Sequence, residues 1–231
     1  RYHYTELNEV MSIVKKSEVW MTDYRYLNDK MEFSKGHKLL LNALKNFDNY
    51  SEIYPEAFKL NINSACKEFE EDDFKDIRSN KIFVASFSKN KDSLSQWRSY
   101  GMYCVELDSV LSNYDIEMLT CHYMRDSSVA MRYANEILTN SILLVLLKKW
   151  KHNNNVNLYN SFIWMVEIYA LTFKNEAFSD EDEIRLVINC DSDDPNIDFR
   201  PKGDMLIPFY RLKLSSCEVR EIIVGPVGNQ N

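Results

Sequence analysis

The order of helical and strand patterns is the strongest constraint on how this chain can fold. The two longest helical patterns cover residues 127–150 and 158–173, and strand patterns lie on both sides of them. Helices inserted between strands in this way are typical of an α+β fold. We therefore expect one α+β domain over residues 1–231, with helical insertions around 30–78 and 127–173.

The shorter patterns complete this expectation. Apolar residues at strand spacing predict strands at 2–4, 19–22, 82–87, 102–107, 115–123, 183–189, 206–214 and 219–224. Apolar residues at helical spacing predict helices at 7–17, 30–47, 55–69 and 93–100. Thr5 is the expected N-cap of the first helix, and Ser127 or Ser128 that of the helix at 127–150. Residues 199–204 are expected to form a turn.

Composition disfavours several classes of function. The net charge is -7, whereas proteins that neutralise nucleic-acid phosphates over a large surface are usually basic. The longest apolar run, at 142–147, is far shorter than the roughly 20 residues needed to cross a bilayer. We therefore expect an ordinary globular protein with no membrane partner.

The cysteines and histidines give no sign of a metal site. The 5 cysteines are scattered without a CxxC pair, and the 4 histidines are widely spaced. Free thiols suit a reducing compartment, so we expect a cytoplasmic protein without a metal. A nuclease with a Mg²⁺ site built from Asp29, Glu32, Glu181 and Glu183 stays a disfavoured alternative.

Three features could carry chemistry. His3 lies on the first strand, and Ser86 and Ser88 end the strand at 82–87. Glu181 and Glu183 have the i, i+2 spacing that places two side chains on one face of a strand. Paired carboxylates can stabilise a cationic centre, but they also occur on solvated strand edges. A hydrogen-bonded structural role is the corresponding alternative for His3.

The segment after the strand at 82–87 adds further candidates. Trp97, Arg98 and Tyr100 follow within a short helical pattern. Loops and turns at strand ends can expose side chains without disturbing the core. The alternative is that Trp97 anchors the helix in the core, which is the commoner role of tryptophan.

Several motifs together resemble an uncharacterised bacterial domain family. They are an HYT-like start, LNDKMEF, FVASFS, LSQWRSYG, EDEIRLV and EIIVGP, and they span nearly the whole chain. No motif matches at 46–80 or 124–175. Family members continue past the last motif, and this chain begins with Arg1 rather than Met, so we expect it to be part of a longer protein.

That family is similar in turn to the ADP-ribosyltransferase superfamily, and most of all to DNA-modifying toxins that begin with a YHxT strand and a helix. The resemblance implies a split mixed β-sheet of the ADP-ribosyltransferase type. It implies that His3 holds the adenosine ribose of NAD+, that Ser86 or Ser88 lines the nicotinamide pocket, and that Glu183 is the catalytic acid. Glu181 would orient or deprotonate the acceptor.

The resemblance also extends to neighbouring side chains. Trp97 or Tyr100 would stack on nicotinamide, and Arg25 and Asn28 would contact phosphates or the target. The other members of the expected NAD+-binding set are Tyr4, Thr5 and Arg98.

The implied function is NAD+-dependent ADP-ribosyl transfer to DNA, RNA or protein by a toxin or anti-phage effector, with an antitoxin or regulatory partner. A carboxylate below the ribose carbon would stabilise the positive charge that develops as the glycosidic bond breaks. Two alternatives stay open. One is an NAD+ glycohydrolase with water as acceptor. The other is a non-catalytic binding module of the same fold, in which Glu183 simply pairs with Arg98 or Arg185.

Overall fold

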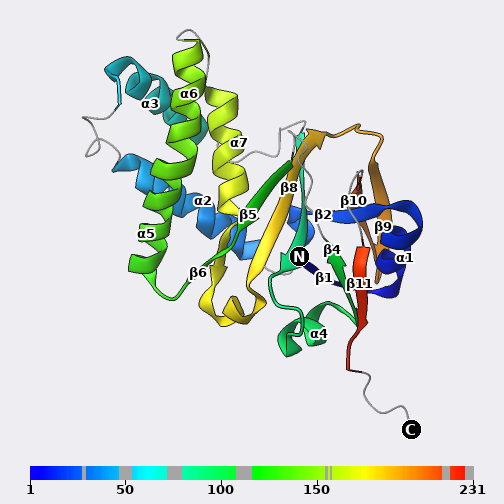
Figure 1. Cartoon of the computed structure of the whole chain (residues 1–231). Coiled ribbons are helices and arrows are strands. Elements are labelled where there is room, and N and C mark those ends of the chain that lie inside the picture. Colours follow the sequence, from blue (N-terminus) through cyan, green and yellow to red (C-terminus); the bar gives the residue numbers. More distant parts are fainter. Residues whose placement is uncertain are drawn as a thin grey trace. The chain divides into compact units, whose positions relative to one another are not determined.

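The computed structural model describes residues 1–27, 30–46, 54–71, 80–107, 116–153, 156, 158–214 and 219–226. Over these residues the protein is a mixed α+β structure with a curled antiparallel sheet (Figure 1). The chain divides into two compact units. Unit 1 comprises Arg1–Asn28, Ser79–Cys121 and Ala177–Asn231, and unit 2 comprises Asp29–Arg78 and His122–Glu176.

The described part of unit 1 contains the sheet and two helices. Its helices are α1 (Leu7–Lys16) and α4 (Leu94–Tyr100), with 3-10 turns at Tyr24–Tyr26 and η4 (Glu176–Glu181). Its strands are β1 (Tyr2–Thr5), β2 (Glu18–Asp23), β3 (Asn80–Ser88), β4 (Tyr103–Leu107), β5 (Ile116–Thr120), β8 (Glu183–Asp191), β9 (Ile197–Lys202), β10 (Met205–Lys213) and β11 (Val219–Val224).

The sheet splits at β3. The strand order is β11-β4-β1-β3-β2-β10-β9, and β8 joins β3 to β5. Because β8 pairs with β3 over its whole length, β1 and β2 must share the opposite edge. There β1 meets only the end of β3, at Ser88, whereas β2 meets its middle, at Phe83 and Val84. Every described pairing in this sheet is antiparallel, so the expected mixture of strand directions does not occur in it.

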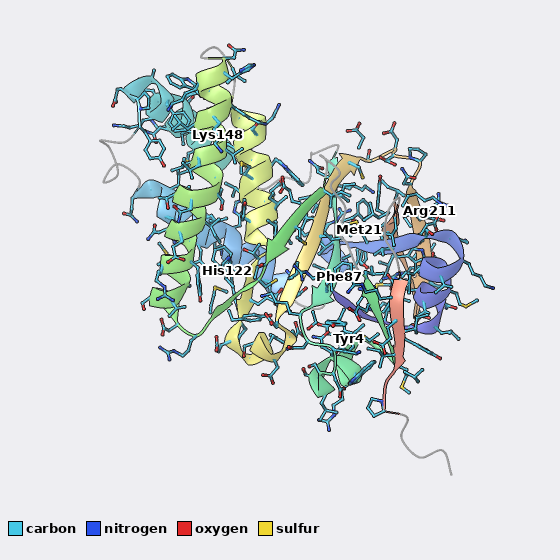
Figure 2. All side chains as sticks on the ribbon, viewed as in Figure 1. Tyr4, Met21, Phe87, His122, Lys148 and Arg211 are labelled. Carbon is cyan, nitrogen blue, oxygen red and sulfur yellow. The ribbon has the colours of Figure 1, made fainter. Side chains whose placement is uncertain are left out.

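The main core of unit 1 lies between one sheet face and α1. Phe83, Ala85 and Phe87 of β3 alternate with polar or smaller residues and pack with Val10 and Ile13 of α1. The Ile13 side chain is 1% exposed, and burial of one such side chain contributes about 1.5–3 kcal/mol. Figure 2 labels Phe87 and Met21, which belong to this core. A smaller cluster of Tyr4, Trp97 and Cys104 is a second core.

Unit 2 is a helical bundle with one small parallel sheet. It contains α2 (Lys30–Lys45), α3 (Glu56–Glu71), α5 (Ser127–Ile137), the π turn Leu138–Ile142, α6 (Leu143–His152), α7 (Tyr159–Ala170), β6 (His122–Met124) and β7 (Phe173–Asn175). Its core is built from fully buried side chains such as Phe58 and Phe162. Among the described residues, no helix has both the length and the apolar character that crossing a membrane requires.

Most predicted elements form, and the exceptions have local causes. The turn expected at 199–204 is strand β9 followed by a tight reversal at Gly203 (φ 59°). Pro201 lies within β9, which pairs only with β10 among the described strands, and an edge strand tolerates a residue without an N–H. The strand expected at 115–123 is broken at Cys121 into β5 and β6, which belong to different sheets.

Two helix caps also differ from the prediction. Asp126, and neither Ser127 nor Ser128, caps α5, because its carboxylate accepts from the amides of Ser128 and Val129. Thr5 does not cap α1: Glu6 occupies the N-cap position, and the Thr5 hydroxyl donates to Glu9. The helix expected at 158–173 ends at Ala170, and Phe173 begins β7.

Candidate functional site

The three strands that carry the motif residues are neighbours in the sheet. Tyr2 of β1 lies opposite Ser88 of β3, and Ser88 lies opposite Glu183 of β8. Tyr2, Ser88 and Glu183 therefore form one row across β1, β3 and β8.

The row also decides which side chains share a face. Residues directly opposite one another point to the same face, and successive residues alternate. Tyr2, Ser86, Ser88, Glu183 and Arg185 therefore lie on one face, which we call the Ser88 face.

His3 and Thr5 lie on the opposite face, which we call the His3 face. The ring of His3 lies 5.1 Å from that of Phe87, a residue of the α1 core. The structure thus brings the predicted residues onto adjacent strands but divides them between two faces.

The two predicted acids are both buried, but only one is on a strand. Glu181 is the last residue of η4, so the i, i+2 strand spacing expected for the pair does not apply. Asp182, between them, has a left-handed backbone (φ 40°). Glu181 is 6% exposed and Glu183 5% exposed, and Glu181 Oε1 accepts a 2.9 Å hydrogen bond from the Tyr100 hydroxyl.

Glu183 forms a two-pronged ion pair with Arg185. Arg185 Nε donates to Glu183 Oε1 at 2.8 Å, and its Nη2 donates to Oε2 at 3.2 Å. Arg185 is 4% exposed, so the pair is held away from solvent. Such fork-to-carboxylate contacts are the stronger kind of charged hydrogen bond, and they fix the orientation of both groups.

The serines are engaged with the protein backbone. The Ser88 hydroxyl donates to the Glu181 carbonyl at 2.7 Å and accepts from the Asn90 amide at 3.0 Å. The Ser86 carbonyl accepts from Nδ1 of His3 at 2.8 Å.

A buried charged cluster surrounds His3. His3 Nε2 lies 3.2 Å from Glu9 Oε1, and Glu9 Oε2 accepts from the Thr5 hydroxyl at 2.6 Å and lies 3.7 Å from Arg200 Nη1. Burial is the largest influence on His3 and lowers its pKa, but the Glu9 carboxylate and the Ser86 carbonyl together raise the pKa above its ordinary value. Burial would raise the pKa of Glu9, but His3, Thr5 and Arg200 together lower it.

Trp97 and Tyr4 pack against each other on the Ser88 side of β1. Their rings meet edge to face at 4.7 Å, and Trp97 Nε1 donates to Asp92 at 2.7 Å. The Tyr4 hydroxyl donates to the Asn90 carbonyl and accepts from the Ser93 amide. These contacts tie the segment between β3 and α4 to β1.

The remaining predicted residues are dispersed. Arg98 is exposed at the surface of α4. Arg25 forms two side-chain hydrogen bonds with Asp23, at 3.0 and 2.7 Å. Asn28 and Asp29 lie outside the described residues.

Sequence reasoning missed several residues of these networks, among them Glu9, Asp182 and Arg200. Glu9 carried no signal, because the apolar spacing of this helix falls at Leu7, Val10, Met11 and Val14. Only Val10 of these is buried, and the buried face of α1 includes Glu9 instead. The sequence held no sign for Arg200 either, which comes from a segment expected to be a turn.

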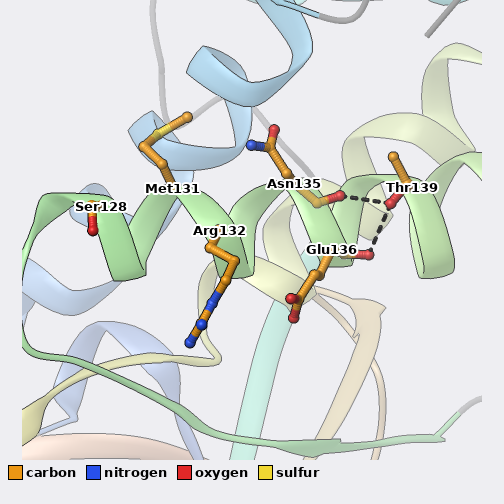
Figure 3. Close-up of a pocket in the computed structure, with 6 residues that line it drawn as sticks. All are labelled: Ser128, Met131, Arg132, Asn135, Glu136 and Thr139. Atoms are coloured by element: carbon orange, nitrogen blue, oxygen red, sulfur yellow. Dashed lines mark hydrogen bonds between the residues drawn. The ribbon is translucent and has the colours of Figure 1, made fainter.

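A surface hollow of about 560 Å³ lies on α5 and the π turn that continues it, away from the motif residues in sequence (Figure 3). Figure 3 shows that its residues project from one helix and that the Thr139 hydroxyl reaches back to the carbonyls of Asn135 and Glu136. The lining residues are Ser128, Met131, Arg132, Asn135, Glu136 and Thr139. Within the described ranges, no group of three or more His, Cys, Asp or Glu side chains is placed to hold a metal ion.

Comparison of the chain with protein-family models, with curated proteins and with solved structures found no match in any of the three.

Proposed function

We propose that the protein is an NAD+-dependent ADP-ribosyltransferase whose reaction takes place at the start of β8, on the Ser88 face. The observation that carries the proposal is the row Tyr2–Ser88–Glu183 across β1, β3 and β8. An ADP-ribosyltransferase type of sheet is part of the proposal, and the split of the sheet at β3 supports it.

The two carboxylates near the start of β8 suit the charge that develops on NAD+. Cleavage of NAD+ leaves positive charge on the ribose carbon, while the electron pair of the broken bond departs with nicotinamide. Glu183 and Glu181 supply two carboxylates within buried surroundings, where a fixed charge acts more strongly than in water. We assign Glu183 to the ribose carbon and Glu181, held by Tyr100, to the proton of the acceptor.

Four of the residues predicted to contact NAD+ are engaged elsewhere or lie on the other face of the sheet. His3 points to the opposite face and faces Glu9, so we do not assign it to the same ribose. The Trp97 ring is already in contact with Tyr4, and Ser88 uses its hydroxyl for two backbone groups. Thr5 shares the His3 face.

The proposal extends to the acceptor and the setting. A DNA, RNA or protein acceptor and a toxin or anti-phage role with a regulatory partner go with the transferase activity. A reducing cytoplasm is the proposed compartment, because the four described cysteines, Cys66, Cys104, Cys121 and Cys190, form no disulfide.

The test is release of nicotinamide from NAD+ by the purified chain, with cell extract added to supply acceptors. The Glu183→Gln variant is expected to lose about 10²–10³ in rate, because it removes a preorganised charge at the reacting carbon. Glu18→Gln is the matched control: Glu18 is 5% exposed and pairs with Lys213, and its loss is expected to leave the rate unchanged.

The products and the folded state complete this test. A labelled macromolecule indicates transfer, whereas free ADP-ribose alone indicates that water is the acceptor. No nicotinamide from wild-type protein with intact circular dichroism and a cooperative thermal transition would contradict both NAD+ assignments.

One observation favours a second candidate, a non-catalytic binding module of the same fold. Both carboxylate oxygens of Glu183 accept from the buried Arg185 guanidinium, which is an arrangement of structural ion pairs. Under this hypothesis Glu183→Gln lowers stability, and neither the variant nor the wild type releases nicotinamide.

A further inference from the structure

The chain entering β8 is bound at several points to the chain leaving β3. The Ser88 hydroxyl donates to the Glu181 carbonyl at 2.7 Å. The Lys89 amide donates to the Asp182 carbonyl at 3.1 Å, and Lys89 Nζ reaches Asp182 Oδ1 at 3.0 Å. These contacts hold the two residues that immediately precede Glu183.

Asp182 itself has an unusual backbone. Its φ of 40° lies in the left-handed region, which non-glycine residues other than Asn and Asp rarely adopt. Among the described non-glycine residues, only Ser17 shares a positive φ. Such conformations persist where the surroundings hold them, and they gather at functional sites.

The position of Asp182 gives this conformation a consequence. It lies between Glu181, which ends η4, and Glu183, which begins β8. The chain therefore turns at Asp182, and both neighbouring carboxylates end in buried positions although they are not on one strand.

We propose that Asp182 and Ser88 are positioning residues for the pair of carboxylates. Asp182 sets the direction of the chain between Glu181 and Glu183, and the Ser88 hydroxyl fixes the backbone of Glu181. Neither side chain touches the reacting atoms. This role rests on the proposed function for its catalytic meaning, but its structural content can be measured without NAD+.

The experiment compares Asp182→Val with Asp182→Asn. Valine is poorly suited to a left-handed backbone, whereas asparagine adopts it readily. Ser17→Val is the matched control, because Ser17 has the same backbone region (φ 53°, ψ 47°) at the end of α1.

Amide hydrogen exchange reports the structural effect. The probes are the amides of Lys89 and Cys121, which donate to the carbonyls of Asp182 and Glu183. Asp182→Val is expected to speed exchange at both amides by about 5- to 30-fold, the factor that corresponds to a local loss of one or two kcal/mol. Asp182→Asn and Ser17→Val are expected to leave both amides close to wild type.

Kinetics of nicotinamide release report the catalytic effect. Asp182→Val is expected to lower kcat about 10- to 100-fold with little change in KM, as a small misplacement of catalytic groups does. Ser17→Val is expected to keep wild-type kcat, and Asp182→Asn to restore most of it. Ser88→Ala is expected to lower kcat and to speed exchange at the Lys89 amide, as Asp182→Val does. Wild-type exchange at Lys89 in Ser88→Ala would overturn the role of Ser88.

The outcomes separate the two proposals. Unchanged exchange in Asp182→Val, or equal acceleration in Asp182→Val and Asp182→Asn, would overturn the positioning role of Asp182. Faster exchange in Asp182→Val alone supports it, even if wild-type protein releases no nicotinamide, a result that would contradict the proposed function instead.

Discussion

His3 and Glu9 form an ion pair across the packing of β1 against α1, with 3.2 Å between Nε2 and Oε1 and with side chains only 8% and 10% exposed. Glu9 also accepts from the amide of Trp20 on β2 at 3.3 Å. Since β1 and β2 diverge along one edge of β3, the Glu9 carboxylate links the two strands at the split. The pair therefore ties α1 to both parts of the sheet.

This pair predicts a dependence of stability on pH. The pKa of His3 is raised above its ordinary 6.5, so its stabilising charge is fully present below about pH 6.5 and is lost as the pH rises through the raised value. The pKa of Glu9 is lowered below 4.5, so its contribution is present above about pH 4.5 and is lost as the pH falls through the lowered value. We expect the contribution of the pair to be greatest between these limits.

Glu9→Gln gives the corresponding test by urea unfolding at pH 5.5 to 8.5. The variant is expected to lose about 1.5–3 kcal/mol at pH 6, where the Glu9 carboxylate of the wild type accepts from Thr5 and Trp20 and pairs with charged His3. Burial without the carboxylate lowers the pKa of His3, so the slope of stability against pH should change from falling to rising near pH 6.5. A parallel shift of the whole curve would show that His3 and Glu9 are not coupled.

The Glu183–Arg185 pair predicts a large coupling energy. Arg185→Met leaves a buried carboxylate without this guanidinium and is expected to cost about 3–5 kcal/mol. Glu183→Gln combined with Arg185→Met should be less destabilising than the sum of the two single variants, by about 1–3 kcal/mol. Denaturant unfolding of the four proteins measures this difference, and additive effects would mean that the pair contributes no stability as a unit.

The elements of this fold could largely be predicted because their signals are local. The strand pattern at 82–87 and the helical spacing of Leu7, Val10, Met11 and Val14 each follow from a few neighbouring residues, and β3 and α1 form where these patterns occur. The spacing located α1 but not its buried face, since Leu7, Met11 and Val14 are exposed. The segment 199–204 was not recognised as a strand, because Pro201 in the edge strand β9 and Gly203 in the turn to β10 are residue types that are also typical of loops.

The arrangement of the candidate site could be predicted only in part. The resemblance to a family suggested that His3, Ser88 and Glu183 belong together, and they do lie on adjacent strands. The sequence does not contain the register between strands, and a shift of one residue moves a side chain to the other face. For that reason the separation of His3 from Ser88 became visible only in the structure, and with it the pairing of His3 with Glu9.

The Cys104 thiol is expected to be inert in the folded protein. Cys104 is fully buried, and burial raises its pKa to about 12. Alkylation by iodoacetamide needs the thiolate, so at pH 8 Cys104 should stay unmodified while the fold is intact and react after denaturation in guanidinium chloride. Peptide mass spectrometry measures both states. Modification of Cys104 at the same rate in both would mean that its surroundings open readily.

Gly36 in α2 is expected to reverse the usual effect of a glycine-to-alanine change. In an exposed helix such a change stabilises by about 1 kcal/mol. A Cβ at Gly36 would lie 2.2 Å from the Ala170 carbonyl oxygen and 2.9 Å from Phe173 Cδ2, so α2 could not keep its distance from the end of α7. Gly36→Ala should therefore lower the free energy of unfolding by about 1–3 kcal/mol, the range for overpacked cores. The exposed Lys38 on the same helix provides the control. Lys38→Ala should change the free energy of unfolding, measured in urea, by less than about 0.5 kcal/mol. A Gly36→Ala variant as stable as Lys38→Ala would show that α2 and α7 can separate without cost.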